Sequence, residues 1–406
     1  MKILFLTDNF YPETNAPAKR TYEHSKEWVK IGHQVTIITG VPNFPKGKIF
    51  EGYKNRLFQS ELIDGILVKR VWTYIAENKG FFLRILDYLS FMISSIFCGL
   101  FTKKHDIIIA TSPQFFTLLS GYLISLLRST PLVIEIRDLW PESIVALGSI
   151  KENSFFTKIL YKIAHHIYKK SSLIIVVTNS FKDQLSNINI DKNKILVIKN
   201  GFNFENKLYP NKTHKVIEKI YDIKSNQFIV SYIGTIGMSH GVDIVIRAAE
   251  KAKDIIFLII GEGAEKKNLI NISKKKNLRN VRFIDSIDWQ EIVNVNQLIS
   301  AHLIHLRDLD IFKNVIPSKI FESMALKKPI LAGLNGESLK IIKDSKSGLA
   351  VAQEDEDSLI DKIRYLQTNK AVLTNFGENG ENYVKKNYNR KKLAQKMIKF
   401  IQSRIN

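Results

Sequence analysis

The sequence predicts an α/β protein with two domains, each built around a parallel β-sheet. Short, unbroken apolar runs recur along the chain, and such runs are typical of strands that helices cover on both faces. Segments of helix length separate the runs, as βαβ units require. A length of 406 residues accommodates two or three domains of ordinary size.

The first half of the chain begins with a βαβ unit. We expect a strand over residues 2–7, a helix over 19–31 that ends at Gly32, and a second strand over 34–39. Further apolar runs predict strands over residues 106–110, 132–136, 173–178 and 195–198. These elements define an N-terminal domain over residues 1–203.

The second half repeats the same alternation after a polar stretch. Residues 200–226 contain no strand-like run, and we place a linker over 204–226. The C-terminal domain is predicted over 227–387, and residues 381–406 have the pattern of a basic amphipathic helix, of which about 388–406 is expected to pack back on the first domain. The predicted strands of this half cover residues 228–233, 255–260, 281–284, 301–305, 329–332 and 348–351.

The composition is that of a globular protein from a reducing compartment. Hydrophobic residues make up 45% of the chain and charged residues 24%, which excludes a disordered or fibrous protein. The single cysteine, Cys98, cannot form an internal disulfide. The apolar run before Asp8 is too short for a signal peptide, so we expect a cytoplasmic location.

The net charge of +21 favours polyanionic partners. Such a charge attracts nucleic acid, phosphorylated substrates or an anionic membrane leaflet. The lysines are dispersed or in short runs, so a simple solvated surface explains the charge equally well. No nucleic-acid-binding motif accompanies it.

Residues 81–101 form an apolar segment of about 21 residues, the length that spans a bilayer. Arg84 and Asp87 interrupt its first third, which argues against a true span. One interpretation is a helix buried in the domain. The other is a helix whose apolar face rests on the inner leaflet, with Arg84, Lys103 and Lys104 at its ends.

Two loops of the first half follow predicted strands, where ligands of parallel sheets bind. After the first strand, Asn15 and Ala16 precede a helix whose free N–H groups could meet an oxyanion, although a plain connection is the alternative. The segment lacks the glycines of a dinucleotide fingerprint. The second loop holds Arg137 and Asp138, which either form a structural pair or bind an acceptor hydroxyl.

Two glycine-rich loops of the second half also follow strands. Glycines allow a phosphate to approach the backbone closely, and tight-turn chemistry is the alternative. Their candidate ligand-binding residues are Gly234, Thr235, Gly237, His240 and Gly241 in the first loop, and Gly261, Glu262 and Gly263 in the second.

Residues 306–332 contain the densest set of candidate groups. Pro317 and Ser318 suit the start of a helix, which places Lys319 in its first turn beside free N–H groups. Such a cationic mouth suits a diphosphate, with Arg307 as a possible second cation. Glu322 could accept two hydrogen bonds from a ribose diol, or could simply favour the helix N-terminus.

The order of these motifs resembles the retaining family 4 glycosyltransferases of GT-B fold. In that family two glutamates stand eight positions apart in a strand–loop–helix segment; Glu322 matches the second, and Asn314 occupies the position of the first. The diphosphate-binding Arg and Lys of the family are absent from residues 235–241. The segment VIKNGFN at 197–203 is similar to the V-x-P-N-G-V-D junction of the family. Similarity to a bacterial surface-polysaccharide branch rests on the segments PSKIFE at 317–322, DLWPES at 138–143 and GVPNFPKG at 40–47.

The resemblance implies two Rossmann-like domains with parallel sheets that face a central cleft. It implies transfer of a sugar, with retention, from a UDP-sugar to a polyprenyl-diphosphate-linked acceptor in O-antigen or capsule synthesis. Several members of the resembled branch use donors of N-acetyl-fucosamine type, and we expect such a donor here. The enzyme would be peripheral on the inner face of the cytoplasmic membrane and would need no metal. The expected catalytic residues are Lys319, Glu322 and Asp138; the expected donor-binding residues are the eight glycine-loop residues with Arg307, Asn314, Ser318, Lys319 and Glu322; the expected acceptor-binding residues are Asn15, Ala16, Arg20, Arg137 and Asp138.

Two other functions stay open at this point. A sugar-nucleotide epimerase of GT-B fold would share the donor site but would need only water and no membrane acceptor. A basic nucleic-acid-binding protein would explain the charge but not the loops at two sets of strand ends.

Overall fold

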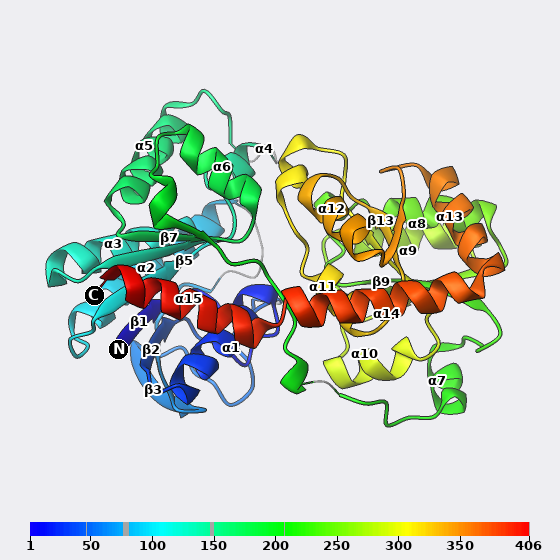
Figure 1. The fold of residues 1–406 in the computed structure, drawn as a ribbon, viewed down its shortest axis with the longest axis horizontal. Helices are drawn as coiled ribbons and strands as arrows, with labels where there is room; N and C mark the ends of the chain where they lie inside the picture. The colour runs from blue at the N-terminus through cyan, green and yellow to red at the C-terminus, as the bar shows by residue number, and fades with distance from the viewer. Residues whose placement is uncertain (46, 76–80, 147–149, 207, 406) are drawn as a thin grey trace. The chain divides into compact units, whose positions relative to one another are not determined.

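The computed structural model describes the chain except for residues 46, 76–80, 147–149, 207 and 406 (Figure 1). It divides into two compact units. Unit 1 contains Met1–Lys199 together with Arg390–Asn406, and unit 2 contains Asn200–Asn389. Each unit is an α/β structure around its own sheet, as the sequence predicts.

Unit 1 is organised around an eight-stranded sheet with the strand order β3-β4-β2-β1-β5-β6-β7-β8. All neighbouring strands are parallel except β3, which is antiparallel to β4. The strands are β1 (Lys2–Leu6), β2 (Gln34–Thr39), β3 (Phe58–Ile63), β4 (Ile66–Val71), β5 (Ile107–Thr111), β6 (Leu132–Ile136), β7 (Leu173–Val176) and β8 (Ile195–Val197).

The hairpin of β3 and β4 is absent from the strands predicted from the sequence. The search for unbroken apolar runs misses it because β3 lies at the sheet edge and alternates exposed with half-buried residues. Its turn, Asp64-Gly65, has positive φ at both residues, the conformation that an Asp-Gly hairpin favours. The Asp64-Gly65 dipeptide, with apolar residues on both sides, was therefore the sequence signal that could have predicted this hairpin.

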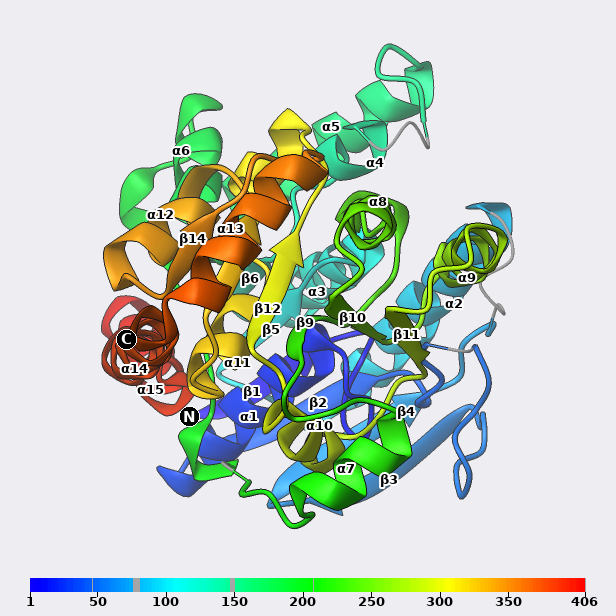
Figure 2. The same cartoon turned by 90° about the vertical axis from the view of Figure 1, so that its right-hand side faces the viewer.

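Helices cover both faces of the unit 1 sheet. On one face, buried residues of α2 (Phe81–Leu100), α3 (Phe115–Arg128) and α5 (Phe155–Lys170) pack against the strands, with α6 (Asn179–Asn187) beside them. On the other face lie α1 (Ala16–Lys30) and α15 (Arg390–Ile405), which lie side by side in both views (Figure 2). Trp28 of α1 is fully buried and donates its indole N–H to the carbonyl of Ala394, 2.9 Å away. A short helix, α4 (Glu142–Ala146), follows β6.

Unit 2 contains a six-stranded, wholly parallel sheet in the order β11-β10-β9-β12-β13-β14. Helices cover both faces, with separate apolar clusters on the two sides. Its strands are β9 (Phe228–Ile233), β10 (Ile255–Ile260), β11 (Val281–Ile284), β12 (Ala301–His305), β13 (Ile330–Gly333) and β14 (Gly348–Ala350). Its helices are α7 (His214–Tyr221), α8 (Asp243–Lys251), α9 (Lys266–Lys275), α10 (Trp289–Asn296), α11 (Lys319–Ala325), α12 (Gly336–Ser345), α13 (Glu356–Thr368) and α14 (Lys370–Asn387).

Two boundaries differ from the sequence prediction. The expected linker over 204–226 contains α7, whose Ile217 is fully buried in the core of unit 2. The single helix expected over 381–406 is two helices, α14 and α15, which belong to different units. The chain leaves the helical conformation at Tyr388, whose ring packs against Phe321 at a centroid distance of 4.6 Å.

Candidate active site

The glycine loops of unit 2 lie together at one edge of its sheet. Because β9, β10 and β12 are parallel, their carboxyl ends meet at that edge. Gly234, Gly261 and Gly263 all have positive φ. A Cβ on Gly261 would lie 2.0 Å from the carbonyl oxygen of Gly234, so the two loops need glycine in order to pack against each other.

Lys319 lies directly against the first of these loops. A Cβ on Gly234 would lie 2.4 Å from the Lys319 side-chain carbon Cε. The ammonium donates to the Tyr232 hydroxyl at 2.7 Å and lies 4.1 Å from the centroid of that ring. Tyr232, which is 1% exposed, donates in turn to the Thr235 carbonyl. The chain Lys319–Tyr232–Thr235 therefore links the start of α11 to the glycine loop.

The environment of Lys319 is unfavourable for a positive charge. Burial lowers the pKa of Lys319 to about 7, although the nearby Glu322 carboxylate opposes the shift. In the free protein, the side-chain amine of Lys319 is therefore only partly protonated near neutral pH. An arriving anion would stabilise the charged form.

Glu322 stands one turn after Lys319, and both line the same small hollow beside Trp289 and His302. Ser318 occupies the N-cap position of α11 without a capping bond from its side chain. Asn314 ends the short 3-10 turn η4 (Asp310–Asn314) and is not among the residues that line this hollow. The structure thus brings Lys319 and Glu322 together, whereas the sugar-contacting role of Asn314 stays a prediction.

Arg307 has protein partners that the sequence did not reveal. Its guanidinium donates to the Met238 carbonyl, to Asp243 at 2.9 Å and to Glu354 at 2.6 Å. These contacts position the loop that carries Gly237 and Gly241. Arg307 would have to exchange them in order to bind a diphosphate.

Two other predicted donor residues also have protein contacts. The main-chain carbonyl of His240 faces Nδ1 of His305 at 2.8 Å, and burial, with the Lys319 charge nearby, lowers the pKa of His240 to about 3. His240 is therefore a neutral ring. Glu262 forms an ion pair with Lys266 at 2.9 Å.

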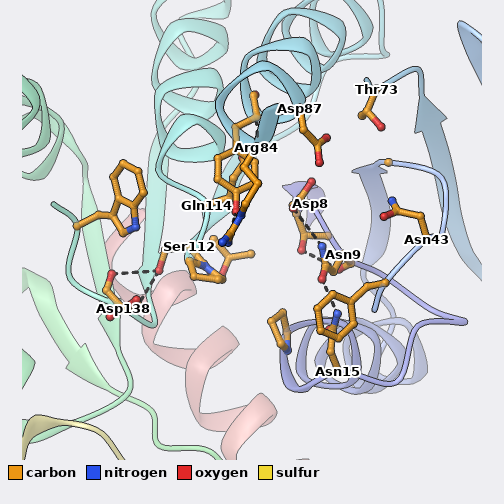
Figure 3. A pocket seen from close by; sticks show the side chains of 18 of the residues that line it. Asp8, Asn9, Asn15, Asn43, Thr73, Arg84, Asp87, Ser112, Gln114 and Asp138 are labelled. Atoms are coloured by element: carbon orange, nitrogen blue, oxygen red, sulfur yellow. Dashed lines mark hydrogen bonds between the residues drawn. The ribbon is translucent and has the colours of Figure 1, made fainter. Parts of the chain in front are cut away.

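Unit 1 contains a separate pocket of about 410 Å³ (Figure 3). Asn15 and Asp138, two of the predicted acceptor-binding residues, line it. Asn15 also caps α1, since its side chain accepts from the Ala18 N–H at 2.9 Å, which places Ala16 at the helix start. The Ser112 hydroxyl accepts from the backbone N–H groups of Arg137 and Asp138 and thereby fixes the loop after β6. Burial raises the pKa of Asp138 to about 6.

The acceptor-binding role expected for Arg20 is not compatible with its position. Arg20 and Glu135 are each 1% exposed and form an ion pair at 2.8 Å. Arg20 also donates to the carbonyls of Ile198 and Lys199, and it does not line the pocket. Arg20 is a structural residue, because it lies on the face of helix α1 that packs against the sheet.

The alternative of an Arg137–Asp138 ion pair is also wrong. Within the part of the chain that the structure describes, Nε and Nη1 of Arg137 are buried without a hydrogen-bond partner. Burial and the charges of Arg20 and Arg390 lower the pKa of Arg137 to about 9. Arg137 does not line the pocket, so its acceptor-binding role stays a prediction.

Three charged pocket residues were missed by the sequence reasoning. Asp8 directly follows β1, while Arg84 and Asp87 come from the first turns of α2. The signal for Asp8 was its place at a strand end. Arg84 and Asp87 were noted only as interruptions of an apolar segment, because the sequence does not show that α2 begins beside the β1 loop.

Helix α2 is long and apolar enough to cross a membrane, judged by length and composition, and 22% of residues 83–100 are buried. Phe91 and Cys98 pack into the unit 1 core. Ile93, Phe97 and Phe101 are 51%, 55% and 84% exposed. Helix α2 is therefore partly a core helix, as the interpretation of a buried helix expects. It also leaves an apolar stripe exposed, which the interpretation of a membrane-docking helix requires.

The two Rossmann-like units, with the glycine loops, Lys319 and Glu322 together in unit 2, are those of a glycosyltransferase of GT-B fold. Residues 18–206 match the model of Glycosyltransferase Family 4, and residues 214–383 match that of Glycosyl transferases group 1. Together the two matches cover most of the chain, which belongs to this group of glycosyltransferases.

Similar proteins extend over nearly the whole chain. The "Putative colanic acid biosynthesis glycosyl transferase WcaI" of Escherichia coli K12 is 24% identical over 387 residues, 90% of this chain and 91% of that protein. Sucrose-phosphate synthase from Thermosynechococcus elongatus has a similar structure, with a TM-score of 0.76 at 15% identity, covering 99% of this chain and 98% of that one. HepE of Anabaena, in complex with UDP and glucose, has a TM-score of 0.74 at 15% identity, covering 99% of this chain and 100% of that one.

Proposed function

We propose that this glycosyltransferase moves a sugar from a UDP-sugar to a lipid-linked oligosaccharide, with retention, during the synthesis of a surface polysaccharide such as O-antigen or capsule. The observation that carries the proposal is the contact of Lys319 with the glycine loop at Gly234, beside Glu322. The similarity to a colanic acid biosynthesis protein and to a structure that holds UDP and glucose supports it.

The donor site assigns separate tasks to its residues. The Lys319 ammonium neutralises the diphosphate as it leaves, and backbone N–H groups of residues 234–241 and of the start of α11 donate to its oxygens. Glu322 accepts from the ribose hydroxyls. Negative charge develops on the leaving diphosphate in the transition state, so groups that stabilise this charge supply much of the rate, and the proposed mechanism needs no metal.

The acceptor is bound by unit 1, where Asn15 and Asp138 line the pocket. The exposed apolar stripe of α2 rests on the cytoplasmic leaflet, and the net charge of +21 attracts anionic lipids. This stripe favours transfer to a lipid-linked acceptor over the epimerase alternative, because an epimerase has no need of a membrane surface. An N-acetylated deoxy-amino sugar of the fucosamine type is the proposed donor.

The decisive experiment is a screen of UDP-sugars against a polyprenyl-diphosphate-linked acceptor, with the product anomer determined by NMR. We expect transfer of an N-acetylated deoxy-amino sugar with its α or β configuration unchanged. Inversion would refute retention, and interconversion of free UDP-sugars without any acceptor would establish the epimerase instead. The Glu322→Gln variant serves as the matched control with an impaired donor site.

A further inference from the structure

The pocket of unit 1 has an excess of carboxyl groups. Asp8, Asp87 and Asp138 line it, with Arg84 as its one cation among the described lining residues. Asp8 enters from the loop after β1 and Asp87 from α2, so that both carboxyl groups lie on the same side of the pocket (Figure 3).

These carboxyl groups are poorly satisfied by the protein itself. Asp8 accepts one side-chain hydrogen bond, from the Asn9 amide at 3.1 Å. Asp87 has no hydrogen-bond or ion-pair partner within the described chain. Arg84 forms no hydrogen bond or ion pair with either of them among the described residues, since its guanidinium donates to the Tyr88 hydroxyl at 3.1 Å.

Electrostatics agrees with this geometry. Burial, together with the charges of Asp87 and Glu13, raises the pKa of Asp8 well above its usual range. Burial raises the pKa of Asp87 to about 6, and Arg84 only partly opposes the shift. The protein thus stabilises the charged form of both carboxyl groups poorly, and a ligand whose hydroxyls donate to them would be stabilised.

We propose that Asp8 and Asp87 make this pocket selective for the charge of the acceptor sugar, so that it accepts a neutral, hydroxyl-rich ring and rejects a uronic acid. The proposal rests on the proposed function in taking the ligand to be a sugar acceptor. Ring hydroxyls form hydrogen bonds with the two carboxyl groups, whereas a uronate would place a further negative charge beside Asp87, in surroundings where burial already disfavours the charged form of Asp8. The volume of about 410 Å³ suits a small ligand.

The other lining groups fit the same ligand. Amide side chains of Asn9, Asn43 and Gln114 can donate to or accept from hydroxyls. Trp140 and Tyr88 offer ring faces for the apolar side of a sugar, and Trp140 is held by stacking on Phe115 at 5.7 Å. Arg84 is the one cationic side chain among the described lining residues.

The test uses the full chain without donor and simple probes: methyl hexopyranosides and the matching methyl uronosides, with binding measured by ligand-observed NMR titration. Wild-type protein should bind at least one hexoside and should bind its uronoside at least about tenfold more weakly, the size of effect that one like charge produces. Asp87→Asn should reduce that ratio about tenfold, because it removes the like charge, even though the loss of a charged acceptor also weakens hexoside binding. Asp8→Asn is the second variant, and Asp183→Asn, an exposed carboxylate of α6, is the matched control that should leave the ratio unchanged.

Equal binding of hexoside and uronoside by the wild type would overturn the proposal, as would an unchanged ratio in both folded pocket variants. Absence of any glycoside binding would overturn it as well. UDP binding, measured on the same samples by calorimetry, reports on the donor site separately. Loss of charge selectivity with intact UDP binding refutes only this inference, whereas charge selectivity without UDP binding refutes the donor assignment of the proposed function.

Discussion

At the scale of single residues, Lys319 and Glu322 are the groups that we propose to bind the diphosphate and the ribose, in a site whose glycine loop lacks an Arg and a Lys. Both project from the first turn of α11, and Gly234 leaves room for the Lys319 side chain. A larger residue at position 234 would displace the ammonium, since its Cβ would lie 2.8 Å from Nζ. The glycine and the lysine therefore form one functional unit.

Glu322→Gln should weaken UDP binding by about 1.5–3 kcal/mol, the value of a hydrogen bond to a charged acceptor. The amide keeps the shape of the side chain but loses the charge that the ribose hydroxyls need. Isothermal titration calorimetry with UDP measures the change. Glu378→Gln, an exposed glutamate of α14, is the control, and equal UDP affinity in the two variants would remove Glu322 from the donor site.

Donor affinity should fall as the pH rises above about 7. Because the free-state pKa of Lys319 is lowered to about 7, the ammonium is largely neutral at higher pH and must take up a proton when diphosphate binds. The dissociation constant for UDP should then increase by up to about tenfold per pH unit between about pH 7 and 9. Lys319→Arg stays charged and should abolish this slope, whereas an identical slope in that variant would show that another group titrates.

At the scale of elements, helix α2 combines two roles that its composition alone cannot separate. One side contributes Phe91 to the core, and the other exposes Ile93, Phe97 and Phe101. The side chains of Phe81 and Phe82 lie outside those that the structure describes. The exposed residues are thus the ones to change in a test of membrane contact.

Phe97→Ser and Phe101→Ser should release the protein from anionic vesicles while its thermal stability changes little. Each exposed ring would lose roughly 1.5–3 kcal/mol of burial in the leaflet. Phe91→Ser is the contrasting variant, because a polar group in the core should lower the melting temperature strongly. Vesicle sedimentation and thermal melting of the three variants measure both effects, and retained vesicle binding in the two surface variants would rule out docking through α2.

Elements were predictable where burial on both faces produced continuous apolar runs, as in β5 and β10. The edge strand β3 was not predicted, because one of its faces is exposed to solvent and its sequence contains no continuous apolar run.

The end of α14 was not predicted for a different reason. Residues 381–406 favour helix throughout, and the packing of Tyr388 on Phe321 accompanies the break between the two helices.

At the scale of the whole molecule, we propose that the excess of 60 basic over 39 acidic residues acts together with the apolar stripe at a membrane surface. Charge attracts an anionic surface over a distance that salt shortens to about 10 Å at 0.1 M. Burial of apolar side chains does not depend on salt in this way. The two contributions can therefore be separated in one titration.

Binding of the wild-type protein to vesicles that contain anionic lipid should weaken as sodium chloride increases from about 0.05 to 0.5 M, without disappearing. Vesicles of neutral lipid provide the control and should bind weakly at every salt concentration. Complete loss of binding at high salt would mean that the apolar stripe contributes nothing. Binding that ignores salt would exclude a role for the net charge.

Two α/β units, the positions of most strands along the chain and the loops that carry the candidate donor-site residues can all be predicted from the sequence. These features depend on local patterns, because apolar periodicity and glycine at strand ends act over neighbouring positions. The pairing of Lys319 with Glu322 at a helix start was predictable for the same reason, since both lie within one turn of α11.

The environment that distant side chains share depends on the tertiary structure and cannot be predicted from the sequence. It paired Arg20 with Glu135 in the core, engaged Arg307 with Asp243 and Glu354, and brought Asp8 beside Asp87 of α2. Partners separated by tens of residues leave no periodic trace in the sequence. The ionisation of such groups depends on burial and on neighbouring charges, which exist only once the chain has folded.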